Sequence, residues 1–218
     1  MSDPFMPVER TSRSSLEALR ILAEFNYPTV ISTKSSLVAS KEYLAVLRRG
    51  MFTVQFSISS TDDALIGQID RWTSSPSQRL AAMGRLSGAS IPTSCRIQPL
   101  LPGRERDAFG VIDRCADIGA HHVSVEHLKL PIERSWMGSG PLSKALGRDV
   151  KDYFVEHHAT RIGREWILPM EERLPRMLEL RQYAHHRGLT FGAADNDFLL
   201  FSDGRSCCAG LDGLSGFQ

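Results

Sequence analysis

The sequence is poor in cysteine and lacks the cysteine spacings that mark metal sites. Its 218 residues contain four cysteines, Cys95, Cys115, Cys207 and Cys208, with no C-x2-C or C-x3-C pair among them. An autonomous cysteine-bound zinc or iron–sulfur site is therefore not encoded by spacing. Four cysteines in a chain of this length also do not indicate a secreted disulfide scaffold.

Long apolar runs and an excess of one charge are lacking as well. No apolar run approaches the roughly 18 residues that a membrane-spanning helix needs, and the first residues do not form a basic-then-apolar signal pattern. The net charge of +1 gives no general attraction to nucleic acid or to a membrane surface, although a local basic cleft is compatible with it. We therefore expect a cytoplasmic protein without membrane association.

What the chain does have is a regular alternation of helical and β-rich stretches. Its composition, 42% apolar and 23% charged, fits one soluble domain with a real core. Hydrophobic periodicity and turn residues predict helices at 13–26, 40–50, 61–69, 75–89, 105–120, 140–157 and 169–188. Five strands are predicted between them, at 29–33, 52–58, 93–98, 122–127 and 189–193.

Strands separated by helices indicate βα units and an α/β fold with a parallel sheet. Five units are too few for a closed eight-stranded barrel, which takes about 250 residues, so an open doubly wound sheet and an incomplete barrel are the alternatives. In both architectures the reactive surface lies at the carboxyl ends of the strands. The polar residues predicted there are Thr33, Lys34, Ser57, Ser59, Arg96, Gln98, Glu126, His127 and Asp195.

Four stretches, in this order, resemble one protein family. They are SDPFMPVER at 2–10, VISTKSSLV at 30–38, VQFSISSTDD at 54–63 and SSPSQRLAAMGRLSGASIPTSCRIQPLLPG at 74–103. Their order and spacing resemble the spore-photoproduct-lyase-like branch of the radical S-adenosylmethionine (SAM) proteins. The resemblance implies a partial, TIM-like (β/α)6 barrel open on one side. We expect that barrel at residues 1–204, followed by a tail at 205–218.

The resemblance also implies a part that this sequence does not contain. Radical SAM proteins bind a [4Fe–4S] cluster through a Cys-x3-Cys-x2-Cys loop after the first strand, and that loop would lie upstream of SDPF. We therefore expect the chain to lack the first βα unit, through a split gene, a truncated copy or a misplaced start codon. The expected cofactors are SAM and the cluster, with a separate chain as the partner that supplies the cluster loop.

The family chemistry assigns expected roles to individual residues. The cluster reduces SAM to a 5′-deoxyadenosyl radical, which abstracts hydrogen from a substrate. Lys34 matches the family lysine that pairs with the SAM carboxylate, and Ser57 matches a serine that lines the cavity; Asp3, Ser59 and Arg96 are the other expected cofactor contacts. Each role has a competing structural interpretation. Lys34 would be a solvated strand end, Ser57 and Ser59 would form hydrogen bonds with neighbouring backbone groups, and Asp3 would form an Asx turn.

Residues on the later strands are expected to face the substrate. These are Gln98, Glu126 and Asp195, and nucleic acid or another large molecule is the expected substrate class. Residues 105–218 match no motif that would name it. Arg79 matches a family arginine and is interpreted as a structural ion-pair or capping residue.

Histidine and cysteine pairs offer a metal hypothesis that local geometry does not favour. Adjacent residues point in different directions on helices and strands, so neighbouring histidines make a poor pair of ligands, and surface positions are expected. Cys207 and Cys208 are candidate ligands of an auxiliary cluster or zinc, with free thiols as the alternative. The histidine pairs are His121-His122, His157-His158 and His185-His186.

Three functional hypotheses follow from the sequence. The first is a fragment of a radical SAM enzyme that is active once another chain supplies the cluster loop. The second is a non-catalytic remnant or binding subunit that keeps a nucleotide-shaped cleft. The third is an unrelated hydrolase or isomerase on an open α/β barrel, which no nucleophile elbow, P-loop or Rossmann glycine pattern supports.

Overall fold

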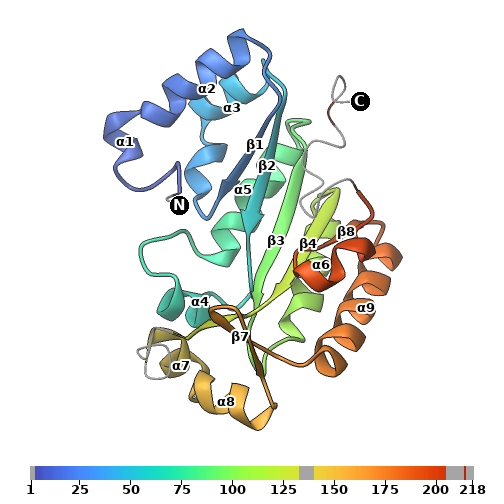
Figure 1. Cartoon of the computed structure of the whole chain (residues 1–218). Coiled ribbons are helices and arrows are strands. Elements are labelled where there is room, and N and C mark those ends of the chain that lie inside the picture. Colours follow the sequence, from blue (N-terminus) through green and yellow to red (C-terminus); the bar gives the residue numbers. More distant parts are fainter. Residues whose placement is uncertain (1–2, 133–139, 205–213, 215–218) are drawn as a thin grey trace.

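Figure 1 shows a computed structural model of the chain, which describes residues 3–132, 140–204 and 214. Five parallel strands form the main sheet in the order β1-β2-β3-β4-β8. All five predicted strands are confirmed, and their order in space follows the chain, as in an open barrel. The strands are β1 Thr29–Thr33, β2 Phe52–Ser57, β3 Thr93–Leu100, β4 His122–His127 and β8 Thr190–Ala193.

Helices connect these strands and cover one face of the sheet (Figure 1). Alternate strand residues such as Phe56 and Val123 are buried in one apolar core with helix residues such as Met83 and Val111. The predicted α/β partial-barrel fold is thus confirmed. The connecting helices are α2 Ser14–Glu24, α3 Lys41–Leu47, α4 Asp63–Ile69, α5 Pro76–Ser87, α6 Asp107–Asp117 and α9 Met170–His186.

The opposite face of the sheet is polar. Side chains two apart on a strand share a face, so the residues that alternate with the core positions point away from the helices. On this face the Ser32 hydroxyl donates a hydrogen bond to Gln55 Oε1 (3.2 Å), and Ser94 and Ser124 continue the polar surface across β3 and β4. Such a face suits the inside of a barrel that receives a polar ligand.

A short helix that the sequence did not predict, α1 (Glu9–Ser12), fixes the N-terminal segment. The buried Glu9 carboxylate accepts hydrogen bonds from the amides of Ser15 and Leu16 and from the Tyr43 hydroxyl. Burial opposes ionisation, but these hydrogen bonds outweigh it and lower the pKa of Glu9. The contacts fasten the N-terminal segment to α2 and α3, beside the carboxyl end of β1.

The region after β4 departs from the sequence prediction. The single helix predicted at 140–157 is wrong, because Gly147 adopts a left-handed backbone (φ 63°) and Asp149 caps a new helix by accepting bonds from Lys151 and Asp152 amides. The two helices are α7 (Pro141–Leu146) and α8 (Val150–Glu156). A small antiparallel sheet, also unpredicted, consists of β5 Leu130–Pro131, β6 Thr160–Ile162 and β7 Glu165–Ile167.

Among the described residues there are also two short 3-10 helices, η1 (Ser36–Ala39) and η3 (Asn196–Phe201). Figure 1 shows α4, α7, α8 and β7 gathered beyond the carboxyl ends of the strands. No helix in the described part of the chain has the length and apolar character needed to cross a bilayer. Of the predicted tail, only Leu214 lies among the described residues.

Candidate functional site

Lys34 follows directly on the carboxyl end of β1 and lines a cavity. Its ammonium lies 2.7 Å from Asp70 Oδ1, and its side chain is 37% exposed. The cavity has a volume of about 290 Å³ and is also lined by Arg10, Trp72 and Gln78. A positive group that is held in place yet reachable from a small cavity can bind an anionic ligand group.

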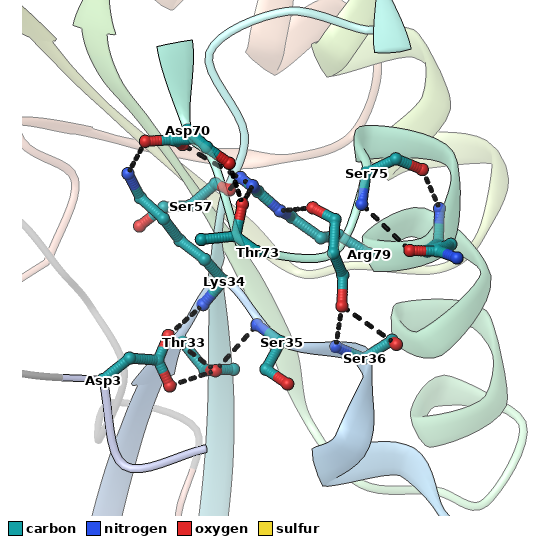
Figure 2. Close-up of polar contacts among 12 residues, drawn as sticks. Asp3, Thr33, Lys34, Ser35, Ser36, Ser57, Asp70, Thr73, Ser75 and Arg79 are labelled. Atoms are coloured by element: carbon teal, nitrogen blue, oxygen red, sulfur yellow. Dashed lines mark hydrogen bonds and ion pairs between the residues drawn. The ribbon is translucent and has the colours of Figure 1, made fainter. Parts of the chain in front are cut away.

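Asp3 fixes the strand end from which Lys34 projects (Figure 2). Its carboxylate accepts hydrogen bonds from the Phe5 amide (2.8 Å), the Thr33 hydroxyl (2.8 Å) and the Lys34 amide (2.6 Å). The hydrogen bond from the Phe5 amide, two residues after Asp3, closes an Asx turn. The interpretation of Asp3 as an Asx-turn residue is therefore confirmed. A contact between Asp3 and SAM stays a prediction.

Arg79 projects from α5 and joins the end of β2 to the loop between α4 and α5. Its guanidinium is 1% exposed and donates hydrogen bonds of 2.7 Å to three acceptors, the carbonyls of Ser57 and Ser74 and the Thr73 hydroxyl. Burial lowers the pKa of Arg79, and the nearby Asp70 carboxylate acts in the opposite direction. The structural role that the sequence predicted for Arg79 is confirmed.

Asp70 links these two cations. It lies between Lys34 and Arg79 in Figure 2, with Arg79 Nη2 at 3.5 Å from its second oxygen. A half-exposed ion pair such as Lys34–Asp70 contributes only about 0–1 kcal/mol. Because Arg79 stays beside Asp70, Lys34 can turn to a ligand carboxylate without leaving Asp70 unpaired. The geometry therefore permits an exchange of one carboxylate for another.

The loop that carries Asp70 was not recognised in the sequence as part of the site. Ser74 ties it to β1 and η1, because its amide donates to the Lys34 carbonyl (3.3 Å) and its hydroxyl accepts from the Ser36 amide (2.8 Å). Trp72 adopts a left-handed backbone (φ 68°) and is 90% exposed at the edge of the cavity. The anchors on either side hold this unusual backbone in place.

The other predicted cofactor residues lie along the same end of the sheet. Ser57 pairs with Arg96 in the β2–β3 register, and the β1–β2 register, continued by one residue, places Lys34 next to Ser57. The side chains of Ser57, Ser59 and Arg96 are half-buried and make no hydrogen bond or ion pair with any described residue. The register thus aligns Lys34, Ser57 and Arg96, whereas Ser59 lies beyond the end of β2.

The three predicted substrate residues meet in a second polar cluster. Gln98 donates to Glu126 Oε2 (2.6 Å), and Lys129 Nζ lies 2.5 Å from Glu126 Oε1 and 3.6 Å from Asp195 Oδ1. Asp195 also accepts from the His127 amide (3.1 Å) and lies 2.8 Å from His127 Nδ1. Lys129, which the sequence did not single out, connects the two halves of this cluster.

The ionisation of Asp195 makes this cluster a source of pH-dependent stability. Burial opposes ionisation, but hydrogen bonds from His127 and the charge of Lys129 outweigh it and lower the pKa of Asp195. An unfolded aspartate titrates near about 3.9. Because the folded pKa lies below that value, ionised Asp195 stabilises the fold above about pH 4, and this contribution is lost as pH falls through the lowered pKa.

We therefore expect Asp195→Asn to flatten the pH dependence of the unfolding free energy below about pH 4. Urea denaturation of the wild type and the variant at pH values from about 7 to about 3 measures this. Glu171→Gln, at an exposed position in the first turn of α9, is the matched control and should leave the slope unchanged. Equal slopes for wild type and Asp195→Asn would contradict the assignment.

The described residues do not fit an iron–sulfur cluster. They contain no group of three histidine, cysteine or carboxylate side chains arranged to hold a metal. Cys95 and Cys115 are buried in the apolar core, where burial first and then the neighbouring Cys115 raise the pKa of Cys95 and disfavour its thiolate. The predicted auxiliary ligands, Cys207 and Cys208, lie outside the described residues.

The histidine pairs are not uniformly on the surface. His122 is buried, with Nδ1 2.9 Å from the Thr190 hydroxyl, so the surface prediction is wrong for this residue. The reason is the strand itself, which directs His121 and His122 to opposite faces. His157 lies beside the Glu172 carboxylate, and His185 lies beside the Asp203 carboxylate. Both histidine side chains are partly exposed.

Comparison with solved structures shows which fold this is. A spore photoproduct lyase complexed with dinucleoside spore photoproduct matches with a TM-score of 0.61, and a mutant of it with bound S-adenosylmethionine and dinucleoside spore photoproduct with 0.62. Both are 19% identical to this chain over 84% of it. A domain of pyruvate-formate lyase-activating enzyme from Bacteroides vulgatus matches with a TM-score of 0.55 and 15% identity, over 89% of this chain and 95% of that domain.

These neighbours are radical SAM proteins, so the chain has the radical SAM partial-barrel fold. The chain spans 56% of the length of the spore photoproduct lyase chains that it matches. No protein-family profile matches the sequence, and no curated protein matches it significantly. At these identities the comparison establishes the fold, and the residues of the site carry the functional argument.

Proposed function

We propose that this chain is the SAM-binding part of a radical SAM enzyme. The observation that carries the proposal is the position of Lys34, whose ammonium lines a cavity of about 290 Å³ at the carboxyl end of β1. In parallel α/β sheets this edge is where ligands bind. A structural neighbour with bound S-adenosylmethionine shares the overall fold, over 84% of this chain.

Lys34 is proposed to bind the carboxylate of the methionine moiety. On binding, the ligand carboxylate replaces Asp70 beside the ammonium, and Asp70 stays next to Arg79. Ser57, Ser59 and Arg96 supply further polar groups along the strand ends, and Asp3 holds the end of β1 in position. SAM, when bound and reduced, supplies a 5′-deoxyadenosyl radical that abstracts hydrogen from a substrate.

We propose that the cluster that reduces SAM is held outside the described residues. Such a cluster needs three thiolates, and the described residues contain only two buried cysteines in the apolar core. The electron-transfer step is therefore not a property of the described residues. Their part is to bind SAM and to orient its carboxylate.

The cluster of Gln98, Glu126 and Asp195 is proposed to face the substrate. It lies at the carboxyl ends of β3, β4 and β8, the same edge of the sheet as Lys34. Donors and acceptors of both charge signs are present there, which suits a substrate that is recognised by hydrogen bonds. The dinucleoside in the spore photoproduct lyase complexes motivates nucleic acid as the proposed substrate class.

Equilibrium dialysis tests the proposal with two ligands that differ in one group. We expect SAM to bind the purified chain and decarboxylated SAM, which lacks the carboxylate, to bind weaker by about tenfold or more. The positive sulfonium and the adenosine are the same in both ligands. Equal affinities would exclude a carboxylate clamp, and the absence of SAM binding would overturn the proposed function.

A further inference from the structure

Lys34 has a carboxylate beside it in the free protein. Its ammonium lies 2.7 Å from Asp70 Oδ1, the separation that a charge-assisted hydrogen bond to a ligand carboxylate would also have. Within the part of the chain that the structure describes, Asp70 is the only ion-pair partner of Lys34. Asp70 therefore occupies the place that the proposed function gives to the carboxylate of SAM.

Backbone contacts and a second cation hold the Asp70 carboxylate where it is. The Asp70 amide donates to the Ile66 carbonyl (2.8 Å) at the end of α4, and the Thr73 hydroxyl donates to the Asp70 carbonyl (2.7 Å). The buried Arg79 guanidinium lies 3.5 Å from the second carboxylate oxygen of Asp70. Because of these contacts, Asp70 is fixed in place and cannot follow Lys34 into the cavity.

The side chain of Lys34 is the partner that can move. Its backbone is fixed, because the Lys34 amide donates to Asp3 Oδ2 (2.6 Å) and the Lys34 carbonyl accepts from the Ser74 amide (3.3 Å). The ammonium is a point charge with three donors at the end of a flexible four-carbon stem. The side chain is partly exposed and lines the cavity. A ligand carboxylate can therefore reach the ammonium, but it has to take it from Asp70.

We propose that Asp70 is a built-in competitor of the SAM carboxylate. It holds Lys34 in the free protein, a carboxylate ligand displaces it, and it takes Lys34 back when the ligand leaves. Figure 2 shows Asp70 between the two cations, and the cation that stays, Arg79, keeps Asp70 paired during the exchange. This inference rests on the proposed function, because it takes Lys34 as the carboxylate site.

Such a competitor lowers affinity selectively. When only a fraction of the protein is competent to bind, the apparent dissociation constant rises by the inverse of that fraction. The usual strength of a partly exposed ion pair sets this factor at about two- to fivefold. The factor is the same for every ligand that binds through Lys34, and it is absent for a ligand that does not need the lysine.

Asp70→Asn removes the competing charge and keeps a polar side chain of the same size beside Arg79. In equilibrium dialysis we expect this variant to bind SAM about two- to fivefold more tightly than the wild type. L-Methionine, which carries the carboxylate without the adenosine, should gain by the same factor, and decarboxylated SAM should gain nothing. Glu24→Gln removes an exposed negative charge at the end of α2, away from the cavity, and should bind SAM as the wild type does.

Two further measurements separate competition from other effects. In the Lys34→Ala background, Asp70→Asn should leave SAM affinity unchanged, because no lysine remains to compete for. In protein without ligand, the NMR signal of carbon-13-methylated Lys34 should shift in Asp70→Asn and stay in place in Glu24→Gln. Thermal unfolding followed by circular dichroism checks the fold, and Asp70→Ser is a second uncharged variant that should show the same gain.

Three results would overturn the inference alone. The first is SAM affinity that is unchanged or weaker in Asp70→Asn, and the second is a gain that persists without Lys34, which would be a general charge effect. The third is a Lys34 signal that does not respond to the loss of Asp70. If neither the wild type nor Asp70→Asn binds SAM, the proposed function falls and takes this inference with it, so the two failures are distinguishable.

Discussion

Replacing Arg79 with methionine is expected to destabilise the protein by about 3–5 kcal/mol. The methionine side chain fills a similar space but leaves the carbonyls of Ser57 and Ser74 and the Thr73 hydroxyl without their buried donor. Unsatisfied buried polar groups are costly, and a loss of this size is a large part of the stability of an ordinary domain, about 5–15 kcal/mol. The loop that positions Asp70 would lose its anchor at the same time.

Urea denaturation at neutral pH, followed by circular dichroism, measures this effect. Arg85→Met is the matched control, because Arg85 lies on the same helix, is exposed, and donates one long hydrogen bond of 3.4 Å to the Ala39 carbonyl. The control should change the unfolding free energy by less than about 1 kcal/mol. A variant at position 79 that is as stable as the control would contradict the role assigned to Arg79.

The second large effect is on ligand binding. We expect Lys34→Ala to weaken SAM binding by about tenfold or more, because a hydrogen bond to a charged group contributes about 1.5–3 kcal/mol. The same change should cost the fold little, since the Lys34–Asp70 pair is half-exposed and Asp70 keeps Arg79 beside it. A large loss of affinity with a small loss of stability distinguishes a ligand contact from a structural one.

Equilibrium dialysis of SAM against the wild type, Lys34→Ala and Lys41→Ala makes this measurement. Lys41 is exposed in the first turn of α3 and does not line the cavity at Lys34, so its variant removes one positive charge without touching the site. The affinity of Lys41→Ala should equal that of the wild type. If both lysine variants lost affinity alike, a general charge effect would explain the result and Lys34 would not be the clamp.

The strands and several helix ends were predictable because their signals are local. β-Branched runs bounded by turn residues located all five strands, and Ser75 with Gln78 forms the capping box that starts α5. Lys34 drew attention by lying at the end of a strand, and the motif order gave it a proposed role. For these features, neighbouring residues in the sequence contain the information.

The partners of those residues depend on tertiary contacts and were not predictable. Asp70 follows α4 at a turn, and no local pattern shows that the fold brings it between Lys34 and Arg79. Lys129 meets Asp195 across 66 positions in the chain for the same reason. The helical pattern predicts one helix across Gly147, whereas the left-handed backbone of this residue ends α7.

The most direct test of the central claim observes Lys34 itself while SAM binds. The sequence has five lysines, and reductive methylation with carbon-13 keeps their positive charge and gives each a separate NMR signal. We predict that SAM shifts the Lys34 signal most strongly, and that decarboxylated SAM leaves it in place. A Lys34 signal that does not respond to SAM, or that responds equally to both ligands, would contradict the account of this site as a SAM carboxylate clamp.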